Sequence, residues 1–113
     1  MRPPAHGLIM TLEFLETLRP KRENFVATMT PEEKAVMGAH FTYNDRLFAE
    51  GKILVGGAAT DGSIGIIVLR VGSAEEAREI YENDPAVKAG IGYPELHPFR
   101  MGLYAGGKVE VRR

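Results

Sequence analysis

A strongly signalled helix that begins after Thr30 and leads directly into a strand constrains the fold of this chain most. Thr30 can cap free backbone N–H groups, Pro31 suits the first helical position and Glu33 completes a capping box. Gly51 is typical of the left-handed residue that ends a helix, and the apolar run after it predicts a strand over residues 52–59. The sequence therefore predicts a helix that ends near residue 50 and a buried strand behind it.

One side of this helix carries a histidine among apolar residues. Val36, His40, Tyr43 and Leu47 recur at helical spacing, so we expect the imidazole to face a sheet. An imidazole in that position needs a hydrogen-bonding partner. A core histidine held by a backbone carbonyl is the plainer interpretation, and an acid/base group in a cleft is the functional one, because an ordinary imidazole titrates near pH 6.5.

The remaining pattern predicts three further strands and a second helix. The first strand lies within residues 8–18, with an apolar side that Glu16 interrupts, and a polar loop over residues 19–30 follows as a connector or as the rim of a site. The turn at Asp61–Gly62 joins the strand over 52–59 to a third strand over 63–71 as an antiparallel hairpin. The last strand is expected over 93–104.

A second capping box opens the second helix. Ser73 and Glu76 form this box, and the segment Asn83–Pro85 breaks the helix and restarts it, with Asp84 well suited to cap the new start. The order strand, helix, strand, strand, helix, strand then predicts a ferredoxin-like α+β fold. It has a four-stranded antiparallel sheet and both helices on one face.

The third strand is apolar on both sides, although two helices can cover only one face of the sheet. Ile64, Ile66 and Val68 lie on one side, and Ile67, Leu69 and Val71 lie on the other. An uncovered apolar face of this size is an association surface. We therefore expect a homodimer whose sheets pack face to face as a dimeric α/β barrel, with higher oligomers left open.

Length and composition favour one domain in a reducing compartment. With 113 residues, of which 44% are hydrophobic, the chain can build one core. We expect a flexible N-terminal tail over 1–10, the domain over 11–104 and a C-terminal tail over 105–113. A net charge of −1, no cysteine and no membrane-spanning stretch favour a cytoplasmic protein without nucleic acid or membrane as a partner.

Several other residues are candidates for binding a small-molecule ligand, and each also has a structural explanation. Tyr43 can donate to a substrate oxygen or fill the core, Arg19 can hold an anion or sit on the surface, and Gly57 can admit a ligand close to the backbone or form a bulge. Haem at His40, or a metal held by His40, Asp61 and Asp84, has suitable residue types but no second signal. We therefore expect no cofactor and no metal.

Motifs along most of the chain, from Glu13 to Tyr104, resemble the YCII-related (YciI-like) family. The resemblance rests on the order and spacing of these segments: Met37–Tyr43, Leu47–Gly57, Asp61–Gly62, Ser73–Ala77, Asp84–Pro85, Ala89–Gly90 and Glu95–Phe99. It implies a dimeric α/β barrel of the kind found in muconolactone isomerases and small monooxygenases, with a histidine and an aspartate in a cleft. One member type of the family dechlorinates a hydroxylated aromatic.

The resemblance also implies roles for three residues. His40 matches the family histidine, Asp84 matches the aspartate of the Asp-Pro pair, and Asp61 matches an acidic position in the hairpin. Ala58 stands where the family commonly has proline, and Ala86 stands where phenylalanine often follows Asp-Pro. Because of these two differences, the substrate of another family member cannot be assigned to this chain.

The resulting expectation is a small-molecule lyase or isomerase that uses His40 and Asp84, with Asp61, as acid/base groups. The alternative is a non-catalytic homodimer that binds a small metabolite or serves as an interaction module. An enzyme should place His40 beside a carboxylate and an accessible pocket, whereas a structural dimer should pack that space solid.

Overall fold

The elements follow the predicted order, with one short helix and one small hairpin added. The computed structural model describes residues 11–105 and 107–108. The main elements, in chain order, are β1 (Leu12–Pro20), the 3-10 helix η1 (Val26–Thr28), α2 (Pro31–Ala49), β2 (Ile53–Ala58), β3 (Gly65–Val71), α3 (Ala74–Glu82), α4 (Pro85–Lys88) and β4 (Gly92–Phe99). A two-stranded hairpin of β5 (Leu103–Tyr104) and β6 (Gly107–Lys108) follows.

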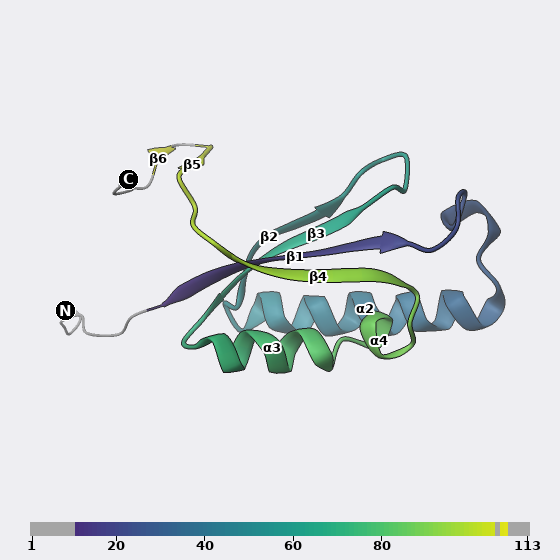
Figure 1. Cartoon of the computed structure of the whole chain (residues 1–113), viewed down its shortest axis with the longest axis horizontal. Helices are drawn as coiled ribbons and strands as arrows, with labels where there is room; N and C mark the ends of the chain where they lie inside the picture. Colours follow the sequence, from purple (N-terminus) through teal and green to yellow (C-terminus); the bar gives the residue numbers. More distant parts are fainter. Residues whose placement is uncertain (1–10, 106, 109–113) are drawn as a thin grey trace.

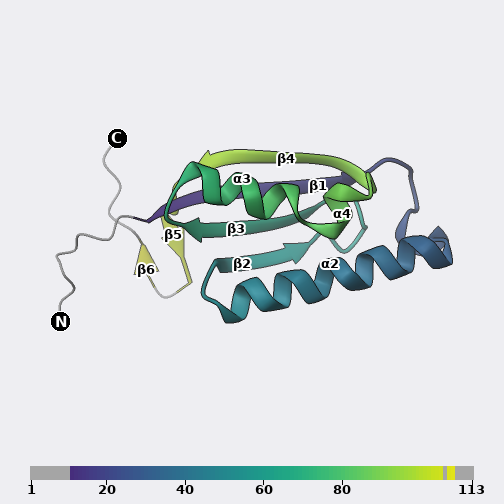
Figure 2. The same cartoon turned by 90° about the horizontal axis from the view of Figure 1, so that it is seen from below.

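The four long strands form one antiparallel sheet in the order β2-β3-β1-β4. Leu15 at the middle of β1 lies opposite Val68 of β3 on one side and His97 of β4 on the other. The helices gather on one face of the sheet (Figure 1), and Figure 2 shows α2 running beside β2 while α3 lies across β3 and β1. This arrangement confirms the ferredoxin-like α+β fold.

The core lies between the sheet and the helices. It consists of buried side chains from strands β1, β2 and β3 and from helices α2 and α3: Phe14, Ile53, Leu69, Val71, Leu47, Ala77 and Ile80. Burial of these apolar surfaces is the main force that holds the helices on the sheet. The inward side of the third strand is therefore Ile67, Leu69 and Val71, as the alternation predicts.

The start of α2 is capped as predicted, and the start of α3 is capped only in part. Thr30 Oγ1 accepts from the Glu33 N–H at 3.1 Å, and the Glu33 carboxylate accepts from the Thr30 N–H at 2.9 Å. Ser73 Oγ accepts from the Glu76 N–H, but the Glu76 carboxylate accepts from the N–H of Gly72. The second capping box is therefore incomplete, because the Glu76 carboxylate accepts from Gly72, one residue before the cap, and not from the N–H of Ser73 itself.

The last strand is shorter than predicted, because β4 covers Gly92–Phe99 and the prediction extended it to residue 104. β4 ends at Phe99, whose partner Glu13 is the second residue of β1, so only Leu12 of β1 remains beyond this pair. The Glu13 carboxylate then accepts from the Met101 N–H at 3.0 Å, and the chain turns away into β5. β5 pairs with β6, which lies in the segment predicted as a C-terminal tail.

Two further expectations concern the ends of the chain. The predicted N-terminal tail over 1–10 lies outside the described residues, and the first strand begins at Leu12 and runs two residues past its predicted end, to Pro20. In the described part of the chain, none of the helices combines the length and the apolar character needed to cross a bilayer.

Candidate functional site

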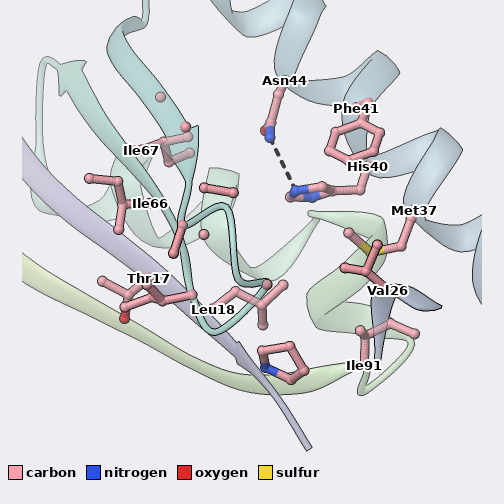
Figure 3. Close-up of a pocket in the computed structure, with 18 of the residues that line it drawn as sticks. Thr17, Leu18, Val26, Met37, His40, Phe41, Asn44, Ile66, Ile67 and Ile91 are labelled. Carbon is pink, nitrogen blue, oxygen red and sulfur yellow. Dashed lines mark hydrogen bonds between the residues drawn. The ribbon is translucent and has the colours of Figure 1, made fainter. Parts of the chain in front are cut away.

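A large cavity lies between α2, the loop after β1 and the hairpin of β2 and β3. Its volume is about 810 Å³. Most of its wall is apolar, and Figure 3 shows Met37 and Phe41 of α2, Val26 of η1, Leu18 of β1 and Ile66 of β3 around it. Polar side chains also reach the wall, among them Glu16, His40 and Asn44. The space that a structural dimer would pack solid is open in this chain.

His40 stands in this wall with a carboxylate directly behind it. Nδ1 of His40 lies 2.8 Å from Oδ1 and 3.0 Å from Oδ2 of Asp84. The imidazole is 14% exposed and the Asp84 side chain 2% exposed, so water competes little for this contact. Because a carboxylate can only accept, Nδ1–H donates to Asp84, and Nε2 is left as the basic nitrogen of the neutral ring.

The local sequence explains why Asp84 is in this place. Asp84 caps α4, where its Oδ1 also accepts from the Ala86 N–H at 2.8 Å, and Pro85 occupies the first helical position. The break between α3 and α4 therefore turns the carboxylate toward α2, whose residues pack against α4. The cap and the contact with His40 use the same carboxylate.

Asn44 lies one turn after His40 on α2 and contacts the second ring nitrogen, Nε2. The Asn44 Nδ2 amide lies 3.3 Å from Nε2 of His40 and donates to it, as Figure 3 shows. Oδ1 of Asn44 is buried without a hydrogen-bond partner in the described structure. The two ring nitrogens are thus held by different groups, which fixes both the tautomer and the plane of the ring.

Glu16 of β1 brings a third titratable group to the same place. Its side chain is 5% exposed, it lines the cavity, and its Oε1 is buried with no hydrogen-bond partner among the described residues. Burial, and then the negative charge of Asp84, raise the pKa of the Glu16 carboxyl to about 7, against a lowering by His40. The three groups therefore influence one another electrostatically.

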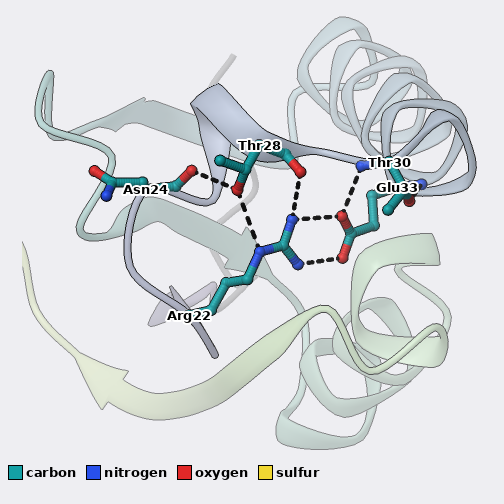
Figure 4. Close-up of polar contacts among 5 residues, drawn as sticks. All are labelled: Arg22, Asn24, Thr28, Thr30 and Glu33. Atoms are coloured by element: carbon teal, nitrogen blue, oxygen red, sulfur yellow. Dashed lines mark hydrogen bonds and ion pairs between the residues drawn. The ribbon is translucent and has the colours of Figure 1, made fainter.

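The loop between β1 and α2 forms one end of the cavity and is held in place by an ion pair. Arg22 donates to both carboxylate oxygens of Glu33, at 2.7 and 2.8 Å, and to the Thr28 carbonyl at 2.7 Å (Figure 4). Phe25 is buried beneath the loop, and Asn24 adopts a left-handed backbone with φ of 57°. The loop predicted as a connector or rim is a fixed wall of the cavity.

The remaining predicted site residues divide into two groups. Gly57 and Asp61 line the cavity, but Asp61 Oδ1 accepts from the Ser63 N–H at 2.9 Å and so holds the hairpin turn. Hydrogen bonds from Ser63 keep the pKa of Asp61 below its usual value. Tyr43 and Arg19 are not part of the cavity wall: the Tyr43 hydroxyl donates to the Ile80 carbonyl at 2.8 Å, and Arg19 lies 3.7 Å from Glu95 on the surface.

Sequence reasoning missed Glu16 and Asn44 as site residues. Glu16 interrupts the apolar side of β1, and a carboxylate on the inward face of a strand is the signal that could have identified it. Asn44 follows His40 by four residues, a spacing that places two side chains on the same face of a helix. In the described residues no group of three or more histidine, aspartate or glutamate side chains is arranged to hold a metal ion.

Fold and site together define a class: a small ferredoxin-like α+β domain with a carboxylate-held histidine in the wall of a largely apolar cavity. The sequence profile of the YCII-related domain matches residues 14–97. The chain therefore belongs to the YCII-related family. No curated protein matches the chain.

A solved structure has a similar fold. It is the 5-chloro-2-hydroxyhydroquinone dehydrochlorinase from Burkholderia phenoliruptrix AC1100, in complex with 2,5-dihydroxybenzoquinone. The two chains share 22% sequence identity with a TM-score of 0.59, and the match covers 79% of this chain and 95% of the other. At this identity the similarity concerns the fold.

Proposed function

We propose that this protein is a small-molecule lyase or isomerase in which His40, held by Asp84, moves a proton on a substrate bound in the cavity. The observation that carries the proposal is the contact of Nδ1 with both oxygens of Asp84 beside an accessible cavity. Asp84 keeps Nε2 unprotonated, so Nε2 can take a proton from a hydroxyl or an activated C–H group once the substrate displaces the Asn44 amide from it. The electron pair released then shifts a double bond or expels a leaving group.

The cavity wall supports a substrate that is small, largely apolar and able to accept or donate hydrogen bonds at its edge. Aromatic and aliphatic side chains from α2 and β3 would contact the faces of a ring. The polar groups that line the cavity include His40 and Asn44 on α2, which contact each other, and Glu16 on β1. A hydroxylated ring has apolar faces and polar edges, so it suits this division.

The dehydrochlorinase with the similar fold supplies two probes. The first is 5-chloro-2-hydroxyhydroquinone, for which turnover is measured as chloride release, and the second is 2,5-dihydroxybenzoquinone, for which binding is measured by calorimetry. We expect chloride release by the wild type and a loss of about 100-fold or more in His40→Gln. Turnover that survives in His40→Gln contradicts the proposal, and binding of the quinone without turnover by the wild type favours the metabolite-binding alternative.

Nitrogen NMR of the imidazole tests the role of Asp84 directly. In the wild type the ring should be held as the Nδ1–H tautomer while it is neutral, and in Asp84→Asn the two tautomers should mix. Asp61→Asn is the matched comparison, because Asp61 holds the hairpin turn through Ser63. Equal tautomer populations in the wild type and Asp84→Asn would mean that Asp84 does not orient the ring.

We also propose a homodimer formed through the sheet face that the helices leave open. Exposed apolar side chains on that face, such as Val55 of β2 and Phe99 of β4, support this proposal. Light scattering should give twice the chain mass for the wild type and a smaller mass for Val55→Glu, with Glu79→Gln on α3 as a control. A wild type that stays monomeric at high concentration contradicts it.

A further inference from the structure

Glu16 is a buried carboxyl group of the cavity wall, and the proposed function gives it no role. Its strand partners are Ile67 of β3 and Leu96 of β4, so its side chain lies between two apolar neighbours on the helix side of the sheet. One of its oxygens is buried without a hydrogen bond in the described structure. A carboxylate in this position would lose its hydration without compensation, whereas a protonated carboxyl has a proton ready to donate.

The surrounding groups strengthen this conclusion. Asp84 and His40 act on Glu16 electrostatically, and Glu16 in turn acts on the hydroxyl groups of Tyr43 on α2 and Tyr81 on α3. Burial and the negative charge of Asp84 raise the pKa of Glu16 to about 7 and outweigh the opposing effect of His40, so the protonated form of Glu16 is favoured over a wider pH range than usual.

We propose that Glu16 is a second acid/base group of this cavity, which delivers a proton to the substrate while His40 removes one. This inference rests on the proposed function, because it assigns the partner of the His40 proton transfer. The two groups stand on different elements, β1 and α2, and line the same cavity. The substrate class is accordingly one that needs a proton at one position and loses a proton at another, such as a hydroxylated ring or an enolisable carbonyl compound.

The chlorinated hydroquinone probe shows how such a pair balances the reaction. His40 Nε2 takes the proton of the hydroxyl next to the chlorinated carbon, that oxygen becomes a carbonyl, and Glu16 gives its proton to the carbon that carries chlorine. The Glu16 carboxylate then takes the proton of the opposite hydroxyl, and the released electron pair expels chloride and completes the quinone. Glu16 is protonated again, the imidazolium releases its proton to solvent, and the net loss is HCl without an external oxidant.

The test compares the wild type with Glu16→Gln, which keeps the shape of the side chain and a donor but cannot transfer a proton. We expect Glu16→Gln to bind the quinone probe with Kd changed less than about 3-fold and to release chloride about 100-fold more slowly, mainly through kcat. The rate of the wild type should fall as pH rises through about 7, and this fall should be absent from the residual rate of Glu16→Gln. Glu79→Gln, an exposed change on α3, is the matched control and should behave as the wild type.

A spectroscopic measurement separates this proposal from the function on which it rests. The infrared carbonyl band of a protonated carboxylic acid should be present in the wild type at pH 6, missing in Glu16→Gln, and shifted when the quinone probe binds. A wild type that turns over the chlorinated probe while Glu16→Gln matches its rate overturns the proposal and leaves the proposed function standing. If the wild type is inactive but the Glu16 band shifts when the quinone probe binds, the proton transfer is overturned and Glu16 remains a ligand contact. If the wild type is inactive and the band does not respond, both the proton transfer and the ligand contact are overturned.

Discussion

Asp84 accepts from the imidazole of His40 at 2.8 Å through the same carboxylate that caps the first turn of α4. The residue that orients the candidate base is therefore fixed by secondary structure. A helix cap has a defined direction relative to the helix it begins, and α4 packs against α2. The position of the His40 ring thus depends on the short break between α3 and α4.

This double role makes Asp84→Asn and Asp84→Ala distinguishable. Asparagine is as good a cap as aspartate, so Asp84→Asn should keep most of the cap but lose about 100-fold in turnover of the chlorinated probe, because it cannot fix the tautomer. Asp84→Ala should also lose about 2 to 4 kcal/mol of stability, since both the cap and a charge-assisted hydrogen bond disappear. Urea unfolding and chloride release measure the two effects, and full activity in Asp84→Asn would show that the charge of Asp84 is not needed.

Glu16 predicts an unusual dependence of stability on pH. Its pKa in the folded chain is raised from 4.5 to about 7, so the folded state binds more protons than the unfolded state between these values. The stability associated with Glu16 is therefore fully present below about pH 4.5 and is lost as pH rises through about 7, by up to about 3 kcal/mol.

Glu16→Gln isolates this effect. The stability of the variant relative to the wild type should be higher at pH 8 than at pH 5, because only the wild type loses stability as pH rises through about 7. Urea unfolding at both pH values, with Glu79→Gln as the exposed control, gives the comparison. A difference that is the same at pH 5 and pH 8 would show that Glu16 titrates normally.

The sequence predicted the fold well because its signals are local. Thr30, Glu33 and Gly51 mark the ends of α2 by hydrogen-bonding chemistry that any helix obeys, and the alternation in β3 assigns Leu69 and Val71 to the core. The end of β4 could not be predicted in this way. Its length depends on where β1 begins, and a strand's pairing partners are not visible in its own residues.

The sequence predicted the central pair of the candidate site, His40 and Asp84, but not the neighbouring residues Glu16 and Asn44. His40 and Asp84 were named, but their contact joins residues 44 apart, and only the resemblance to a family suggested it. Tyr43 and Arg19 were predicted to contact a ligand, but their side chains interact with other parts of the chain. A hydroxyl or a guanidinium can form hydrogen bonds with many groups in a folded chain. The Ile80 carbonyl and Glu95 are nearby partners that the sequence alone does not identify.

Tyr43→Phe tests whether that hydroxyl is structural. Removal of the hydroxyl leaves the Ile80 carbonyl without this donor, so we expect a loss of about 1 kcal/mol in the free energy of unfolding. Turnover of the chlorinated probe should stay within about 2-fold of the wild type, since Tyr43 is not part of the cavity wall. Thermal unfolding and chloride release are the measurements, and a large loss of rate at unchanged stability would return Tyr43 to the list of substrate contacts.

The pair of Arg22 and Glu33 predicts that one wall of the cavity detaches in acid. The hydrogen bonds from Arg22, followed by the bond from the Thr30 N–H, lower the pKa of Glu33 from 4.5 to about 2. Because the folded pKa is lowered, the contribution of the pair is present above about pH 4.5 and is lost as pH falls toward 2. The loop that carries Val26 should then move more freely while the sheet remains.

Hydrogen exchange of the Thr28 amide reports this movement, because that N–H donates to the Asn24 carbonyl at 3.1 Å within the loop. In the wild type its protection should fall between pH 4.5 and 2, and in Arg22→Leu it should be low at every pH. The Leu69 amide in β3 is the internal control for global unfolding. KM for the chlorinated probe should rise several-fold in Arg22→Leu with kcat little changed, since the loop forms a wall and holds none of the acid/base groups. Equal protection of Thr28 in both proteins at pH 7 would mean that Phe25 alone holds the loop.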